Sequence, residues 1–181
     1  MRKIRFAQRA VGRQSRGAKQ FRREPMPPIF LPLDPETVAR IRSGGPDANG
    51  LPAEHGVSNG TGTPCRCCLR NIPAGEAKLI FAVRPFPALQ PYAETGPAFL
   101  CARDCPPWTG AGVPPVLTES PDYLVKGYSN DHRILPGTGR ITPAPEVADY
   151  TAELLGRPET AFVDIRSARN NCWLTRAKAE A

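Results

Sequence analysis

The sequence has little histidine, few aromatic residues and no long apolar run. Only two of its 181 residues are histidine and 7% are aromatic. No apolar stretch is long enough to span a bilayer, and residues 1–23 lack the apolar region and the small-residue cleavage site of a signal peptide. We also find no glycine-rich loop that could cradle a phosphate and no internal repeat. These absences predict a cytoplasmic protein without a membrane partner.

The first 23 residues contain no acidic side chain. They hold nine of the 24 Lys and Arg residues, so the remainder has 15 basic against 17 acidic side chains, about −2 in net charge. This charge balance argues against a nucleic-acid-binding surface spread over the fold and leaves only the basic tail as a nucleic-acid-binding segment. We interpret residues 1–25 as a disordered extension that binds nucleic acid or targets an organelle, or as a misassigned start with Met26 the natural one.

The high content of turn residues, with 22 prolines and 16 glycines, predicts short elements joined by loops in a single domain at residues 26–181. Asp34-Pro35-Glu36 is typical of a helix start, and the second helix, 145–155, should close with Gly156 at C′. We expect a loop at 44–64. Strands are expected at 78–84, 98–101, 123–128, 140–141, 161–166 and 172–176. The order predicts an α+β fold with a mostly antiparallel sheet, two short helices and Pro/Gly-rich loops.

Six cysteines in a chain without an export signal are expected to be reduced thiols. Cys65 and Cys68 have the spacing of half a tetrahedral zinc site, and Cys101 and Cys105 could supply the other half. The second spacing is unusual, and Leu69 stands where a glycine often follows such a turn. The alternative is that Cys101 is a small core residue at the end of a strand.

A reactive thiol is a second interpretation of the cysteines. Arg66 lies beside Cys65 and Arg169 lies near Cys172, and a guanidinium group stabilises a thiolate. A cysteine nucleophile usually needs a base, which here can only be His55 or His132. Both histidines fall in loop sequence, so a cysteine-dependent enzyme stays an alternative.

Anion binding is a third interpretation. Alternation along the strand 162–166 places Asp164 and Arg166 on one face, opposite the core face. The following turn adds Arg169 and two asparagine amides, and guanidinium and amide groups suit a carboxylate or a phosphate. The competing interpretation is a solvated face on which Asp164 pairs with Arg166. Glu94 in a nearby turn could act as a base or a ligand.

Several strings together resemble an uncharacterised bacterial family of small proteins, domain of unknown function 1203, over residues from about 28 to the end. The strings are Ser43-Gly44-Gly45-Pro46-Asp47-Ala48, Pro64-Cys65-Arg66-x-Cys68-Leu69-Arg70, Arg84-Pro85-Phe86, Pro91-Tyr92-Ala93-Glu94-Thr95-Gly96-Pro97, Gly127-Tyr128 and Arg166-Ser167-Ala168-Arg169-Asn170-Asn171-Cys172. The resemblance implies a single-domain cytosolic protein and supplies no catalytic residue. The resemblance is strongest in the segments around Cys65 and Cys172, whereas Cys67 and Cys101 are not part of the family pattern.

The sequence thus predicts one polar site shared by the Cys65 and Cys172 segments, which binds or acts on a small anionic molecule. Its predicted residues are Arg66, Tyr92, Glu94, Arg166, Arg169, Asn170, Cys65 and Cys172. A structural zinc or interaction module is the first alternative. Its predicted ligands are Cys65, Cys68, Cys105 and Cys172.

Overall fold

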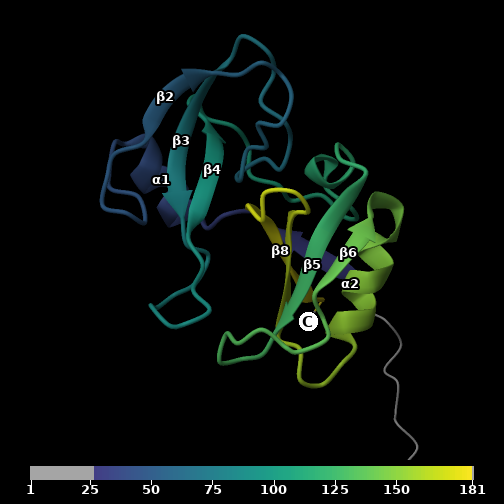
Figure 1. The fold of residues 1–181 in the computed structure, drawn as a ribbon. Helices are drawn as coiled ribbons and strands as arrows, with labels where there is room; N and C mark the ends of the chain where they lie inside the picture. Colours follow the sequence, from purple (N-terminus) through teal and green to yellow (C-terminus); the bar gives the residue numbers. More distant parts are fainter. Residues whose placement is uncertain (1–26, 181) are drawn as a thin grey trace, which may run out of the picture.

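The computed structural model of the chain describes residues 27–180. The predicted extension, residues 1–25, and the predicted start at Met26 lie outside these residues. The described chain forms two antiparallel sheets, each with its own core, and Figure 1 shows them side by side. Neither α-helix in this part of the chain is long and apolar enough to cross a membrane.

The larger sheet has five strands in the order β1-β8-β7-β5-β6. Their bounds are Pro28–Leu31 for β1, Asp122–Tyr128 for β5, Arg140–Pro143 for β6, Phe162–Ser167 for β7 and Trp173–Ala179 for β8. Helix α2, Val147–Leu155, is preceded by the 3₁₀ turn Ala144–Glu146 and covers one face. Val125, Leu154 and Ile165 are fully buried between helix and sheet.

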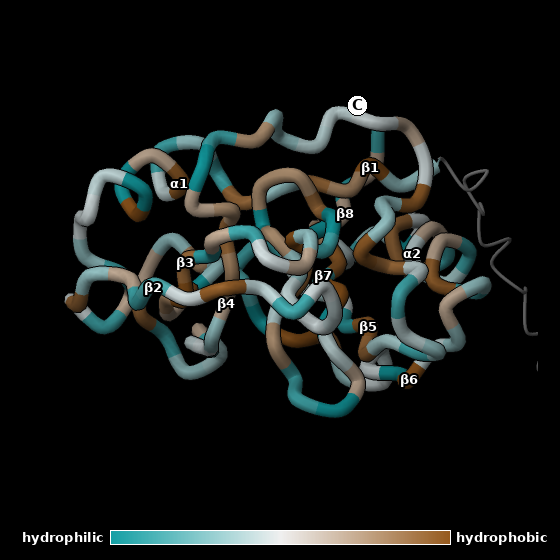
Figure 2. Tube along the Cα trace, turned by 90° about the horizontal axis from the view of Figure 1, so that it is seen from above, coloured by the Kyte–Doolittle hydropathy of each residue, from teal (hydrophilic) through white to brown (hydrophobic). Residues whose placement is uncertain are grey.

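The smaller sheet has three strands in the order β2-β3-β4. Their bounds are Glu54–Val57 for β2, Ala77–Val83 for β3 and Gly96–Cys101 for β4, and helix α1 spans Pro35–Arg42. Along β3 the side chains of Leu79, Phe81 and Val83 alternate with more exposed ones and enter a core that also receives Ile41 of α1. Figure 2 shows the hydrophobic stretches gathered along the strands, with mostly hydrophilic loops around them.

The α+β class and the mostly antiparallel pairing are confirmed, but the strands form two sheets, where the sequence pattern predicted one. The predicted loop 44–64 contains β2, whose residues are almost all exposed and so lack apolar alternation. Strand β1 was also missed, because its four residues are flanked by prolines and give no periodic signal.

Both predicted helices are present, and the cap of α1 has the predicted form. The Asp34 side chain accepts a hydrogen bond from the Thr37 N–H at 2.8 Å and satisfies one of the free donors of the first turn. Gly156 does cap α2, but at φ −72° it is right-handed. Gly156 therefore closes the helix as predicted but as the C-cap itself, one position before C′, and its N–H bonds to the Ala152 carbonyl within ordinary helical geometry.

The loop after α1 is tied to the smaller sheet by the carboxylate of Asp47. One oxygen accepts from the Ala82 N–H at 2.7 Å, and the other accepts from Asn49 at 2.8 Å and Leu51 at 3.1 Å. Burial alone would raise the pKa of Asp47, but these backbone donors outweigh it and hold the pKa below its usual value.

Asp47→Asn should lower the free energy of unfolding by about 1–3 kcal/mol at neutral pH, because the amide cannot accept all three bonds. A lowered folded-state pKa stabilises the fold above the unfolded value, ~3.9, and the contribution fades as the pH falls through the folded pKa. The deficit of the variant should therefore shrink below pH ~4. Urea denaturation across this range measures it, with the exposed Asp149→Asn as control. Equal stability of Asp47→Asn and wild type at neutral pH would contradict the role.

Candidate metal centre and the adjoining pocket

The first pair of clustered thiols lies in a tight turn at residues 64–71. Pro64 and Asn71 form an antiparallel bridge across the turn. The Cys65 N–H bonds to the Arg70 carbonyl at 2.9 Å, and the Leu69 N–H returns to the Cys65 carbonyl at 3.1 Å. Leu69 has φ +50°, in the left-handed region that closes such turns. The backbone therefore holds Cys65 and Cys68 on the same side of the turn.

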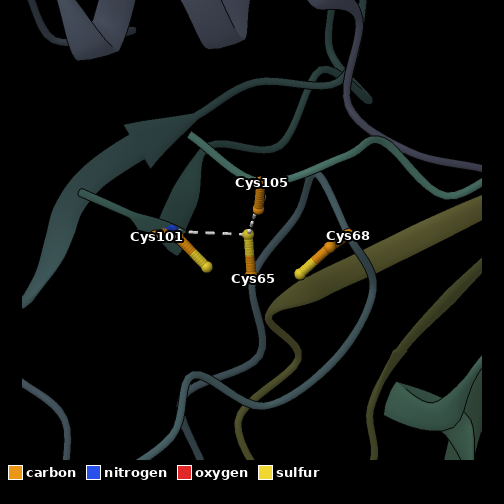
Figure 3. Close-up of side chains that lie close together, drawn as sticks. All are labelled: Cys65, Cys68, Cys101 and Cys105. Carbon is orange, nitrogen blue, oxygen red and sulfur yellow. Dashed lines mark hydrogen bonds between the residues drawn. The ribbon is translucent and has the colours of Figure 1, made fainter. Parts of the chain in front are cut away.

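The second pair comes from the end of β4 and the loop after it. A parallel bridge joins Cys65 to Phe99 in β4, and the Arg66 N–H donates to the Phe99 carbonyl at 2.9 Å. This pairing brings Cys101 and Cys105 next to the turn. All four sulfur atoms, of Cys65, Cys68, Cys101 and Cys105, then lie within 4.8 Å of one another. Figure 3 shows these four side chains gathered at one place.

These separations are close to those of a four-thiolate metal site. A tetrahedral zinc–sulfur distance of about 2.3 Å requires neighbouring sulfurs about 3.8 Å apart. The Cys65 and Cys105 sulfurs are 3.8 Å apart, and contraction by about 1 Å would bring the widest pair to that distance. Cys65 is buried and the other three are half-buried, so the cluster is shielded but lies near the surface.

Hydrogen bonds from outside reach the cluster sulfurs. The Cys101 N–H points at the Cys65 sulfur at 3.4 Å, and the Arg42 guanidinium donates to the Cys105 sulfur at 3.1 Å. Burial opposes the charge on Arg42, but Cys105 and its neighbours raise the pKa of the guanidinium. Donors aimed at sulfur are what orient and stabilise thiolate ligands.

The thiols of the cluster shift one another's pKa values. Hydrogen bonds from Cys101 and then Cys68 lower the pKa of the Cys65 thiol. Donation to Cys65 and to Cys68 raises the pKa of Cys101. The Cys101 bond lowers the pKa of Cys68, but Cys65 and burial outweigh it and bring that pKa to about 12. Without an ion, these bonds therefore favour negative charge on Cys65 over Cys68 and Cys101.

Arg66 is almost completely buried beside the cluster, at 1% exposure. Its Nε donates to the Trp173 carbonyl at 2.7 Å, and its other amino group donates to the Pro64 carbonyl. No carboxylate among residues 27–180 pairs with it. Burial lowers its pKa to about 10, while Cys172 and Cys65 act in the opposite direction. Within the described part of the chain, the thiols of Cys65 and Cys172 are therefore the groups whose ionised form would offset the charge of Arg66.

A small pocket of about 140 Å³ lies between the end of β3, the start of β4 and the turn that joins β7 to β8. Glu94, Arg166, Asn170 and Cys172 line it, as predicted, together with Trp173. Arg66, Tyr92, Arg169 and Cys65 do not line it. The two cysteine segments are thus adjacent through the Arg66–Trp173 bond, but Cys65 belongs to the thiol cluster and Cys172 to the pocket.

The charge of Arg166 is matched within the protein. A Glu94 oxygen lies 2.7 Å from one of its amino groups, and its other amino group donates to the Asn171 carbonyl at 3.0 Å. Glu94 also contacts Lys126 at 3.2 Å. Ligand binding by this pocket stays a prediction, because the arginine already has an anionic partner.

The predicted solvated face of the strand 162–166 is wrong, because the whole stretch is buried. It is the central strand β7, with neighbours on both sides, and both of its faces are covered. Asp164 does not pair closely with Arg166, at 4.0 Å, but binds Arg176 through both oxygens at 2.7 and 3.1 Å. The pattern of one strand could not indicate what covers its second face.

The metal ligands predicted from the sequence overlap with the observed cluster. The structure groups Cys101, and not Cys172, with Cys65, Cys68 and Cys105. The first pairing considered, Cys65 and Cys68 with Cys101 and Cys105, is the observed cluster. The bridge between Cys65 and Phe99 of β4 brings the two pairs together, and the spacing of the cysteines could not predict it. Cys67 is buried nearby, and its thiol points to the Cys105 carbonyl at 3.6 Å.

The histidines lie apart from these thiols. His55 is exposed in β2, and His132 stacks near Phe86 and Phe162 in a turn. Within residues 27–180, no hydrogen bond joins a histidine side chain to a cysteine. The hypothesis of a cysteine-dependent enzyme therefore gains no base from this geometry.

A comparison with protein families matches residues 62–178 to the proteins of unknown function DUF1203. The match covers more than half of the chain, so the chain belongs to this family. All four cluster cysteines and the pocket residues from Glu94 to Trp173 lie within it, while residues 28–61 of the expected resemblance lie outside. None of the curated proteins and none of the solved structures matches the chain.

Arg66→Met should lower the free energy of unfolding by about 3 kcal/mol, since two buried carbonyls lose their donor and the cysteines lose the cation between them. Arg66→Lys keeps the charge but not the two-pronged donor, and should lose about half as much. Guanidinium chloride denaturation measures both variants. If Arg66→Met unfolds at the wild-type midpoint, the buried guanidinium has no structural role.

Proposed function

We propose that this DUF1203 protein is a zinc-binding module whose ion is held by Cys65, Cys68, Cys101 and Cys105. The convergence of these four sulfur atoms within 4.8 Å carries the proposal. Four protein ligands fill a tetrahedral zinc ion and leave no position for water, which is the arrangement of structural rather than catalytic sites. The ion would cross-link the turn at residues 64–71 to the end of β4 and the loop that follows it.

The charges around the cluster support thiolate ligands. Zn²⁺ with four thiolates carries a net charge of about −2. Arg42 donates to the Cys105 sulfur, and the buried Arg66 follows Cys65 without a carboxylate partner. Arg66 can thus offset one negative charge, and Arg42, which also pairs with the exposed Asp104 at 3.0 Å, offsets part of a second. Four neutral thiols would leave the buried Arg66 uncompensated.

The parts that the ion would join also support a structural role. Besides its bridge to β4, the turn at 64–71 receives backbone hydrogen bonds from Leu33 at 2.7 Å and from Trp108 and Val116 at 2.9 Å. Leu69 enters the core of the larger sheet, while Cys65 enters that of the smaller one. An ion in the cluster would therefore hold both sheets to one turn.

Binding of a small anion in the Arg166 pocket is the second candidate function, supported by the convergence of Glu94, Arg166, Asn170 and Cys172. It has weaker support than zinc, because Glu94 already balances Arg166. We place either function in the cytoplasm. Six free cysteines, four of them needed as thiolate ligands, favour a reducing compartment.

Protein purified under reducing conditions should contain one zinc ion per chain by elemental analysis. Serine substitution of Cys65, Cys68, Cys101 or Cys105 should remove most of the metal, because each supplies one of four ligands. Cys67→Ser and Cys172→Ser are matched controls that should retain it. Cobalt substitution should give the intense absorption of tetrahedral thiolate coordination in wild type and in both controls.

Chelation should lower the thermal midpoint of wild type by about 10 °C or more, since a structural ion adds its binding free energy to that of folding. The Cys105→Ser variant should show no further decrease. A metal-free wild-type protein, or a Cys65–Cys105 disulfide found by mass spectrometry under the same conditions, would overturn the proposal. Iron in place of zinc would keep the site and change its ion.

A further inference from the structure

A larger cleft lies between the two sheets, on the side of Trp173 away from the small pocket. Its volume is about 680 Å³, within the range of small-molecule sites. It is bounded by the chain from β1 into α1, the loop that holds Asp47, the end of β3 and the outer part of β8. Trp173 and Phe86 are buried apolar residues in its wall.

The carboxylates that line the cleft are already in use. Asp34 caps helix α1 through the Thr37 N–H. Both oxygens of Asp47 accept backbone N–H groups, from Ala82 on one side and from Asn49 and Leu51 on the other. The cleft therefore presents little free acceptor capacity to a ligand.

Most of the cations are also in use. Arg40 donates to the Pro46 carbonyl at 3.2 Å and to the Thr37 hydroxyl at 3.1 Å. Arg176 is paired with Asp164, donates to the Pro85 carbonyl at 2.8 Å, and lies 3.7 Å above the ring of Phe162. Arg176 is therefore committed to Asp164, whereas the exposed Arg40 shapes the wall with two of its nitrogens and has no ion-pair partner among the described residues.

Arg84 is the exception. It follows β3 and lines the cleft, its Nε is buried without a hydrogen-bond partner, and no carboxylate of the described residues lies within ion-pair distance. The indole Nε1 of Trp173, in the same wall, is likewise a buried donor without an acceptor. Both donor atoms are covered by protein, so each side chain must turn before it reaches an acceptor in the cleft, and pairing would then remove the cost of an unpaired buried donor. Lys178, exposed at the rim, adds a further positive charge.

We infer that this cleft binds a small organic anion, whose carboxylate or phosphate group pairs with Arg84 while its apolar part lies against Phe86 and Trp173. The cleft offers donors and positive charge, three of its four carboxylate oxygens already accept backbone bonds, and part of its wall is apolar, which together fit such a ligand. This site is separate from the proposed zinc centre. It is also distinct from the small pocket, where the arginine is already neutralised.

The test uses the full chain in its metal-loaded form and two probes, benzoate for the carboxylate and phenyl phosphate for the phosphate. Nuclear magnetic resonance titrations follow the Arg84 Nε–H and the Trp173 indole N–H signals, the latter assigned with Trp108→Phe. At least one probe should shift both signals to saturation. Arg84→Gln should weaken its binding about tenfold or more.

Arg157→Gln is the matched control, because it also replaces an arginine by glutamine but does so outside the cleft. Arg157 follows helix α2 and pairs with Glu153. It should bind as wild type does. If neither probe shifts the two signals, or if Arg84→Gln and Arg157→Gln weaken binding equally, the cleft is not the site. The preference between benzoate and phenyl phosphate identifies the anionic group. Zinc content measured on the same samples shows whether any failure arises from the metal centre.

Discussion

The rest of the structure depends on the turn at residues 64–71, whose backbone bonds to β4 of the smaller sheet and to the segment that leads into β5 of the larger one. Phe99 of β4 pairs with it on one side, and Trp108 and Val116 bond to it on the other. Its side chains divide in the same way, since Cys65 packs into one core and Leu69 into the other. A chain rich in proline and short strands forms no single large core, so a local crosslink here would stabilise a disproportionate share of the fold.

Burial of Arg66 in that turn is the second constraint. A guanidinium with only backbone carbonyls as partners is costly to bury, and the residues that can offset it are the thiols next to it. Its bond to the Trp173 carbonyl also fixes the start of β8, which separates the small pocket from the cleft. One side chain thus joins the turn that holds two of the clustered thiols to the strand between the two cavities, through its bonds to the Pro64 and Trp173 carbonyls.

The sequence predicted what local patterning controls and missed what packing controls. The cap at Asp34, both helices and the strands around Val83 and Ile165 follow from periodicity and turn chemistry. The partition into two sheets and the burial of Asp164 did not, because each depends on segments distant in the chain. The cysteine spacing identified all four clustered thiols as one alternative, and only the register of β4 beside the turn distinguishes Cys101 from Cys172.

The same reasoning explains why Arg84, which is not among the predicted site residues, lines the cleft without an ion-pair partner among the described residues. Arg166 sits on the central strand, where a charge can be buried only with a partner, and Glu94 is that partner. Arg84 follows the end of a strand at the boundary between the two sheets, where the chain leaves the core and the backbone offers no acceptor. A guanidinium without an ion pair is tolerated there because the Arg84 side chain is only half-buried, although its Nε is covered. Position in the sheet, rather than the residues beside it in sequence, therefore decides which arginine is structural and which is available to bind.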